Sequence, residues 1–70
     1  MLTEIIIEKL FEQRDFYLNT IKHLEFQLIM DPTDDEIKQN EQLKITTINE
    51  IKKVEDEIRL ILSKNNSNTQ

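Results

Sequence analysis

Two long segments of helical periodicity flank one short break in the chain. Apolar residues recur at alternating steps of three and four along residues 3–30 and again along residues 33–63. Such spacing puts them on one side of an α-helix and is typical of a coiled-coil seam. Between the segments stands Pro32, which cannot continue a helix. The pattern predicts a helix over about 3–30, a turn at 31–33 and a second helix over about 33–63.

The start of the second helix has two possible caps. Thr33 is followed three residues later by Glu36, which matches a capping box. Asp31 as N-cap with Pro32 at the first helical position is an equally valid start. Because so short a turn makes the helices antiparallel, we predict an all-α fold. It is an antiparallel two-helix hairpin, coiled-coil-like, that forms a single domain over residues 1–64. Residues 65–70 lack apolar side chains, so we expect a disordered polar tail there.

The predicted seam differs between the two helices. Its members are Ile7, Leu10, Tyr17, Ile21, Leu24 and Leu28 in the first, and Ile37, Asn40, Lys44, Thr47, Ile51, Val54, Ile58 and Ile61 in the second. The residues expected to widen it are Phe11, Leu18, Leu43, Ile48 and Leu62. Arg14 interrupts the first series, and an antiparallel pairing whose facing numbers add to about 65 brings it near Glu50 and Glu55. The seam of the second helix is markedly polar between Ile37 and Lys44 and apolar from Ile51 onward.

Further apolar residues fall outside both seams. Phe16, His23, Phe26 and Met30 share a second face of the first helix, at spacings of seven, three and four. A hairpin buries one stripe per helix, and burial of a large apolar side chain contributes about 1.5–3 kcal/mol. We therefore predict assembly into a homodimeric four-helix bundle. The predicted interface residues are Ile5, Phe16, His23, Phe26, Ile29, Met30, Ile45 and Leu60.

Two interpretations of the second face stay open. In the first, its aromatic side chains are core residues of the four-helix bundle. In the second, part of the face remains a groove or ridge that receives a helix of another protein. Both predict that the chain acts through protein contacts, with itself and with a protein that the sequence does not identify.

Composition excludes most chemistry. The chain has no Gly and no Cys, so it has no phosphate-binding glycine loop, disulfide or thiolate metal site. His23 has no acidic residue or second histidine three or four positions away, so the Glu-x-x-His pattern of di-iron bundles is absent. Ser63 and Ser67, the only serines, lie in or beside the tail. We expect no enzyme activity, no metal and no cofactor.

The formal net charge of −5 is concentrated at the turn. Four of the fourteen acidic residues stand within residues 31–36, namely Asp31, Asp34, Asp35 and Glu36. Carboxylates in a first helical turn stabilise the helix N-terminus; contact with a cation or a basic partner is the alternative. Net acidity argues against direct nucleic-acid binding. The absence of a signal peptide pattern and of an uncharged 18-residue segment predicts a cytoplasmic protein with no membrane contact.

The length and hairpin layout resemble those of small bacterial phosphatases that act on a sporulation response regulator. That family carries Ser-Gln-Glu-Leu-Asp on its second helix. The nearest stretch here is Asn40-Glu41-Gln42-Leu43-Lys44, in which only Leu43 matches and a lysine replaces the final aspartate. The resemblance therefore concerns architecture, and it assigns no functional residue.

These features predict a complete, small, non-enzymatic regulator or inhibitor that binds another protein through an oligomeric helical surface. Abundant Ile, Lys and Asn without Ala suggest an AT-rich genome, and the small size suits a phage or other mobile element. One alternative is a structural subunit or coiled-coil component of a larger complex. Another is an acidic nucleic-acid mimic that blocks a DNA-binding protein, although residues 37–62 carry balanced charge.

Overall fold

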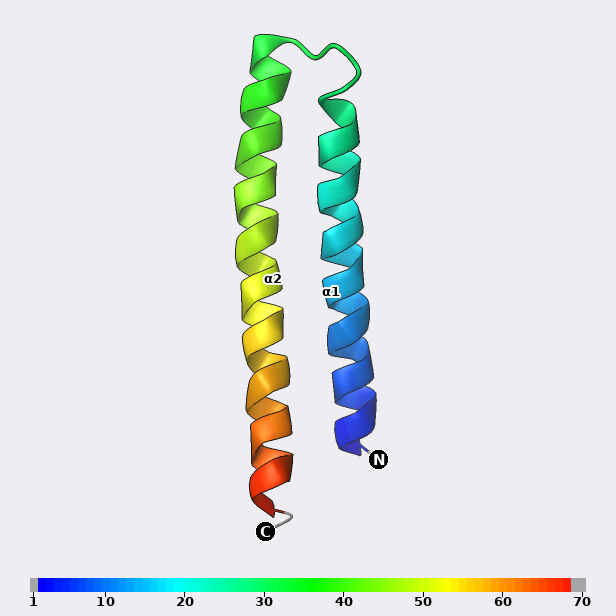
Figure 1. The fold of residues 1–70 in the computed structure, drawn as a ribbon, viewed down its shortest axis with the longest axis vertical. Helices are drawn as coiled ribbons and strands as arrows, with labels where there is room; N and C mark the ends of the chain where they lie inside the picture. The colour runs from blue at the N-terminus through cyan, green and yellow to red at the C-terminus, as the bar shows by residue number, and fades with distance from the viewer. Residues whose placement is uncertain (1, 69–70) are drawn as a thin grey trace.

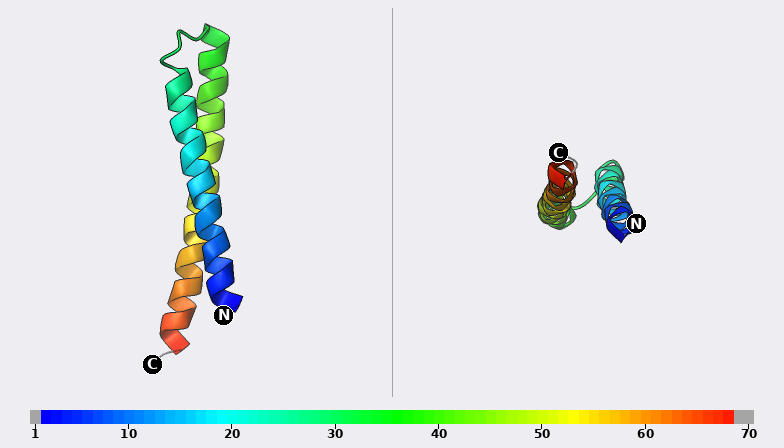
Figure 2. Two further views of the ribbon diagram at one scale, coloured as in Figure 1. Left: turned by 90° about the vertical axis from the view of Figure 1, so that its right-hand side faces the viewer. Right: turned by 90° about the horizontal axis from the view of Figure 1, so that it is seen from below.

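The protein is an antiparallel pair of helices. A computed structural model describes the backbone of residues 2–68 and the side chains of residues 2–64. Helix α1 spans Leu2–Gln27 and helix α2 spans Asp34–Asn68. The two lie side by side along a rod with principal-axis extents of 55 × 16 × 13 Å (Figure 1). Their axes cross at a shallow angle (Figure 2). The predicted all-α hairpin is confirmed.

Helix α1 ends earlier than the apolar periodicity predicts. The periodicity runs through Met30, but the helix stops at Gln27. The amides of Leu28, Ile29 and Met30 donate to carbonyls three residues back, at 3.0–3.2 Å, as in a tightened helix end. Asp31 then adopts a φ of 56°, the left-handed conformation that commonly terminates helices. The end depends on backbone conformation before Pro32, which an apolar pattern does not report.

A capping box starts α2, as the sequence predicts. The Glu36 amide donates to Thr33 Oγ1 at 3.2 Å, and the Thr33 amide donates to Glu36 Oε1 at 3.3 Å. The Thr33 hydroxyl also donates to Glu36 Oε1, at 3.0 Å. These reciprocal bonds satisfy backbone donors that the first turn of a helix leaves without partners. Thr33 is therefore the cap, and the alternative start at Asp31 is not the one adopted.

Helix α2 continues beyond the predicted end near residue 63. Its backbone is helical through Asn68, because residues 64–68 contain neither Gly nor Pro and nothing there breaks the helix. The tail expected over 65–70 stays a prediction, and positions 69–70 lie outside the described residues. In Figure 1, the end of α2 projects past the start of α1.

The seam has an apolar end and a polar end. Near the chain termini, Leu10, Val54 and Ile58 form a buried cluster, with Tyr17 and Ile61 packed against it. Toward the turn, the buried side chains include Asn40 and Thr47. Asn40 Nδ2 donates to the carbonyl of Leu24 at 2.7 Å. This bond crosses between the helices and supplies a donor to the last turn of α1, where carbonyls commonly lack one.

Candidate protein-interaction surface

Large apolar side chains remain at the surface of the hairpin on both helices. Among the described side chains, five apolar ones are buried: Leu10, Leu24, Ile51, Val54 and Ile58. Three times as many large hydrophobic side chains are more than a third exposed. Isolated exposed apolar residues are normal on proteins, whereas many on one small surface mark an interaction site.

Every residue predicted to lie at an interface is exposed. These predicted interface residues are Ile5, Phe16, His23, Phe26, Ile29, Met30, Ile45 and Leu60. They do not form one patch. Ile29 and Met30 lie in the turn after α1 instead of on the helix. Ile45 and Leu60 are fifteen residues apart on α2, which is about 22 Å along the helix axis.

One stripe of α1 keeps its predicted arrangement. Phe16, His23 and Phe26 lie within α1, at helical spacings of seven and three. We call these three residues, with Met30 just beyond the helix end, the outer stripe. The ring of Phe16 also contacts Tyr17 edge-on, with centroids 5.8 Å apart, yet Phe16 remains 66% exposed. A partner can cover the outer stripe without disturbing the seam.

A second apolar surface lies where the sequence predicts only a wider seam. The residues expected to flank the seam are exposed by 36–55%, namely Phe11, Leu18, Leu43, Ile48 and Leu62. The reason is geometric, because two helices bury only the residues that face each other and leave the neighbouring positions at the edge. We call Phe11, Leu18, Ile48 and Leu62 the broad face, since both helices contribute to it. The sequence feature that indicates this surface is the set of apolar residues next to the seam, because a single partner helix cannot cover them.

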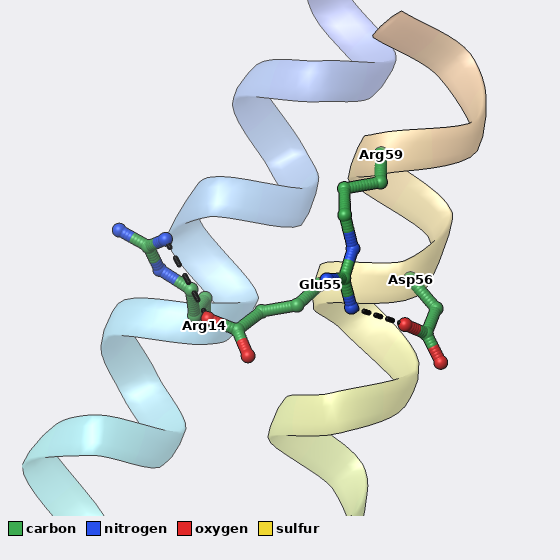
Figure 3. Close-up of polar contacts among 4 residues, drawn as sticks. All are labelled: Arg14, Glu55, Asp56 and Arg59. Carbon is green, nitrogen blue, oxygen red and sulfur yellow. Dashed lines mark hydrogen bonds and ion pairs between the residues drawn. The ribbon is translucent and has the colours of Figure 1, made fainter. Parts of the chain in front are cut away.

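An ion pair crosses the hairpin beside the broad face. The Arg14 guanidinium lies 4.0 Å from Glu55 Oε2, and the Glu55 side chain extends from α2 across to Arg14 on α1 (Figure 3). The same guanidinium lies 5.2 Å from the centroid of the Phe11 ring, within range of a cation–π contact. Of the two predicted partners of Arg14, the structure selects Glu55. Arg59, also drawn in Figure 3, pairs with Asp56 on its own helix.

The acidic turn forms the tip of the molecule. Asp31, Asp34, Asp35 and Glu36 are all exposed. The last three lie in the first turn of α2, where negative charge favours the helix N-terminus. Glu36 additionally completes the capping box. This placement supports local stabilisation of α2 by Asp34, Asp35 and Glu36. Contact of the cluster with a cation or a basic partner stays a prediction.

A hollow of about 390 Å³ adjoins the tip. Its lining is mixed, with Gln27, Glu36, Gln39 and Asn40 among the polar residues and Leu28, Met30, Pro32 and Leu43 among the apolar ones. Asn40 Oδ1 is buried without a hydrogen-bond partner. No group of three or more metal-ligating side chains converges within the described part of the chain. Nor does any helix in residues 2–68 have the length and apolarity needed to cross a membrane.

Comparison with protein-family models, curated proteins and solved structures finds no match to this chain.

Proposed function

We propose that this chain is a small, cytoplasmic, non-enzymatic regulator or inhibitor that self-associates and binds another protein through exposed helical surface. The observation that carries the proposal is the excess of exposed large apolar side chains over buried ones. A helical pair of this size has a small core, and a core below 70–80 residues rarely supplies more than about 3–5 kcal/mol. Association with a second copy covers apolar surface and adds to that core.

The self-associated form proposed here is a homodimeric four-helix bundle. Helices with apolar residues at the seam and at one flanking position match the pattern of bundle helices, whose apolar stripe is wider than that of a two-stranded coiled coil. Phe11 and Leu18 widen the stripe of α1, and Ile48 and Leu62 widen that of α2. A two-fold dimer is the commonest symmetric assembly, and it doubles two helices into four.

The second candidate function is that of a structural subunit of a larger complex. The same exposed apolar surface favours it, because such a subunit meets its neighbours through surface that is exposed in the isolated chain. The nucleic-acid mimic has less support, since a mimic needs a dense surface of one sign. On α2, Arg59 pairs with Asp56 and Lys53 pairs with Glu50, so charges of both signs alternate there.

Affinity capture from the native host tests partner binding. The intact chain is compared with Phe26→Asp, which changes the outer stripe, and with a double variant that neutralises Asp34 and Asp35. We expect specific partners to be retained by the double variant and lost from Phe26→Asp, because a charge disrupts an apolar contact. Loss of every partner from the tip variant alone would contradict binding through the apolar surface.

A further inference from the structure

The two exposed apolar surfaces have different architectures, and this difference assigns an occupant to each. We propose that a second copy of the chain packs on the broad face, antiparallel to the first, with the two turns at opposite ends. The outer stripe then remains available for a different protein. The inference rests on the proposed self-association and specifies the surface and the orientation that produce it.

The four residues of the broad face lie on one side of the hairpin. Arg14 contacts both the Phe11 ring and Glu55, so Phe11 and Glu55 share that side. Leu18 follows Phe11 by seven residues, while Ile48 precedes Glu55 by seven and Leu62 follows it by seven. Residues seven apart keep nearly the same orientation in a pair of packed helices. Both helices therefore present apolar side chains in the same direction.

The opposite flank of the seam is polar. The corresponding positions are Gln13, Thr20 and Gln27 on α1 and Glu36, Glu50 and Glu57 on α2, with Ile6 and Leu43 as the apolar exceptions. Of the three carboxylates on that flank, Glu36 bonds to Thr33 and Glu50 lies 3.4 Å from Lys53, so the two flanks differ in apolar content and not in the pairing of their carboxylates. On the broad-face side, Glu55 pairs with Arg14 and Glu25 pairs with Lys44 at 3.6 Å. The same side also carries Glu4 and Glu41. A second copy seated there covers four large apolar side chains, against two on the opposite flank.

The dimensions of the hairpin suit a second copy. One side of the rod, 55 by 16 Å, has an area of about 900 Å², and a standard protein interface covers about 800 Å² per partner. A matching hairpin is a partner of the same length and the same apolar spacing. A single added helix would cover only part of this width, because a helix with its side chains is about 10–12 Å across.

The charge at the tip sets the orientation. Residues 31–36 carry four carboxylates and no basic residue. In a parallel dimer, the two tips would lie together and repel. In the antiparallel dimer, each tip lies beside the other copy's open end, where Lys9, Arg59 and Lys64 accompany the acidic residues. The antiparallel arrangement thus separates the two regions of greatest negative charge.

The outer stripe cannot join the same interface. Phe16 follows Phe11 by five residues, which is about 140° around an α-helix. A hairpin seated on the broad face therefore leaves Phe16 exposed. This geometry distinguishes the surface for the second copy from the surface for another protein.

Matched surface substitutions test the assignment. Leu18→Glu and Ile48→Glu each place a charge on the broad face, one on each helix, and Phe16→Glu makes the same kind of change on the outer stripe. All three positions are exposed in the hairpin, at 39%, 36% and 66%. Sedimentation equilibrium gives the dimer dissociation constant, and circular dichroism reports helix content. We expect each broad-face variant to raise that constant at least tenfold and Phe16→Glu to change it less than threefold.

The reverse result would overturn the assignment while leaving self-association intact: a weakened dimer in Phe16→Glu, and an intact one in both broad-face variants. A monomeric parent chain would instead contradict the proposed self-association itself. If one broad-face variant loses its helices, the other variant and the orientation measurement below decide the matter.

A spin label measures the orientation. The chain has no cysteine, so Asp35→Cys creates a single labelling site at the tip and keeps the other three carboxylates. The centre of the broad face, through which the two-fold axis of the dimer passes, lies roughly 17 residues from the turn, or about 25 Å at 1.5 Å per residue. Antiparallel copies place one label on each side of this axis, so the two labels lie about 50 Å apart. A distance below about 25 Å, roughly two helix diameters, would show parallel copies and overturn the proposed orientation.

Discussion

The two ends of the hairpin are held together by different interactions. At the open end, Leu10, Val54 and Ile58 pack as a buried apolar cluster. At the turn end, Asn40 donates to the Leu24 carbonyl, and Lys44 lies 3.6 Å from Glu25 across the helix pair. Apolar packing is non-directional and contributes in proportion to the area removed from water. The hydrogen bond and the ion pair at the turn end instead specify how the two helices are aligned, because such directional contacts form in only one register.

The two ends of the rod therefore contribute differently, one through apolar burial and the other through the alignment of the helices. Three of the five buried apolar side chains, Leu10, Val54 and Ile58, cluster near the open end, whereas the buried polar residues Asn40 and Thr47 lie toward the turn. A buried polar residue in a seam fixes register at a cost in stability. Asn40 fits this description, because its Oδ1 is buried without a partner while its Nδ2 is bonded.

The largest expected effect comes from truncating a side chain of the apolar cluster at the open end. Leu10→Ala removes a side chain that is 7% exposed, and such truncations cost about 2–5 kcal/mol in the free energy of unfolding. Since small helical domains have only a few kcal/mol in total, we expect Leu10→Ala to be largely unfolded. Urea denaturation followed by circular dichroism, at a fixed chain concentration, measures the effect.

The control for this experiment is Leu60→Ala on α2. Leu60 is 57% exposed, so its truncation should change the free energy of unfolding by less than about 0.5 kcal/mol. Equal losses in Leu10→Ala and Leu60→Ala would show that the cluster at the open end is not the source of stability.

The polar end is tested by Asn40→Ala. The substitution removes the donor to the Leu24 carbonyl and leaves a small gap, so we expect a loss of about 1–3 kcal/mol. Asn49→Ala is the matched control, because Asn49 is exposed on the same helix. Denaturation of the two variants measures the difference, and an Asn40→Ala chain as stable as Asn49→Ala would contradict a structural role for the bond.

The cap at the start of α2 has a smaller expected effect. Thr33→Ala removes the hydroxyl that accepts from the Glu36 amide, and loss of an N-cap typically costs about 1 kcal/mol. Thr46→Ala, at an exposed position within α2, separates capping from the general effect of replacing threonine. Thermal unfolding curves that coincide for the two variants would contradict the capping role.

The ion pair beside the broad face has the smallest expected effect. The side chains of Arg14 and Glu55 are 34% and 45% exposed, and exposed pairs contribute about 0–1 kcal/mol. A double-mutant cycle with Arg14→Gln and Glu55→Gln measures the coupling in the single hairpin, at chain concentrations below the dimer dissociation constant, where no second copy covers the pair. We expect it to fall further when salt screens the charges. A coupling well above that range, unchanged by salt, would mean that the pair is more deeply desolvated than its exposure indicates.

The sequence predicts the parts of this fold that are local or periodic. Pro32 marks the turn, and the Thr33–Glu36 pair is one of the two caps that the sequence allows and the one that the structure adopts. The buried cluster of Leu10, Val54 and Ile58 also follows from spacing alone, because residues three and four apart share one side of a helix. These features depend on few neighbours, so a single chain reports them.

Other features depend on three-dimensional context. The end of α1 at Gln27 follows from the left-handed Asp31 and the bond from Asn40, and neither appears in an apolar pattern. Spacing places Phe11 beside Leu10 and so assigns the broad face to the seam, without showing how much of it a single partner helix covers. The residues that the sequence assigns to an interface are exposed in the hairpin, and their role in an interface stays a prediction. Their separation into several surfaces requires the register of the hairpin.

Sedimentation equilibrium of the intact chain at micromolar concentration measures whether the hairpin self-associates. We expect a helical species with twice the 8.4 kDa mass of the chain, because a second copy covers apolar surface that the hairpin leaves in water. A stably folded species of 8.4 kDa, with helix content unchanged across the concentration range, would contradict it.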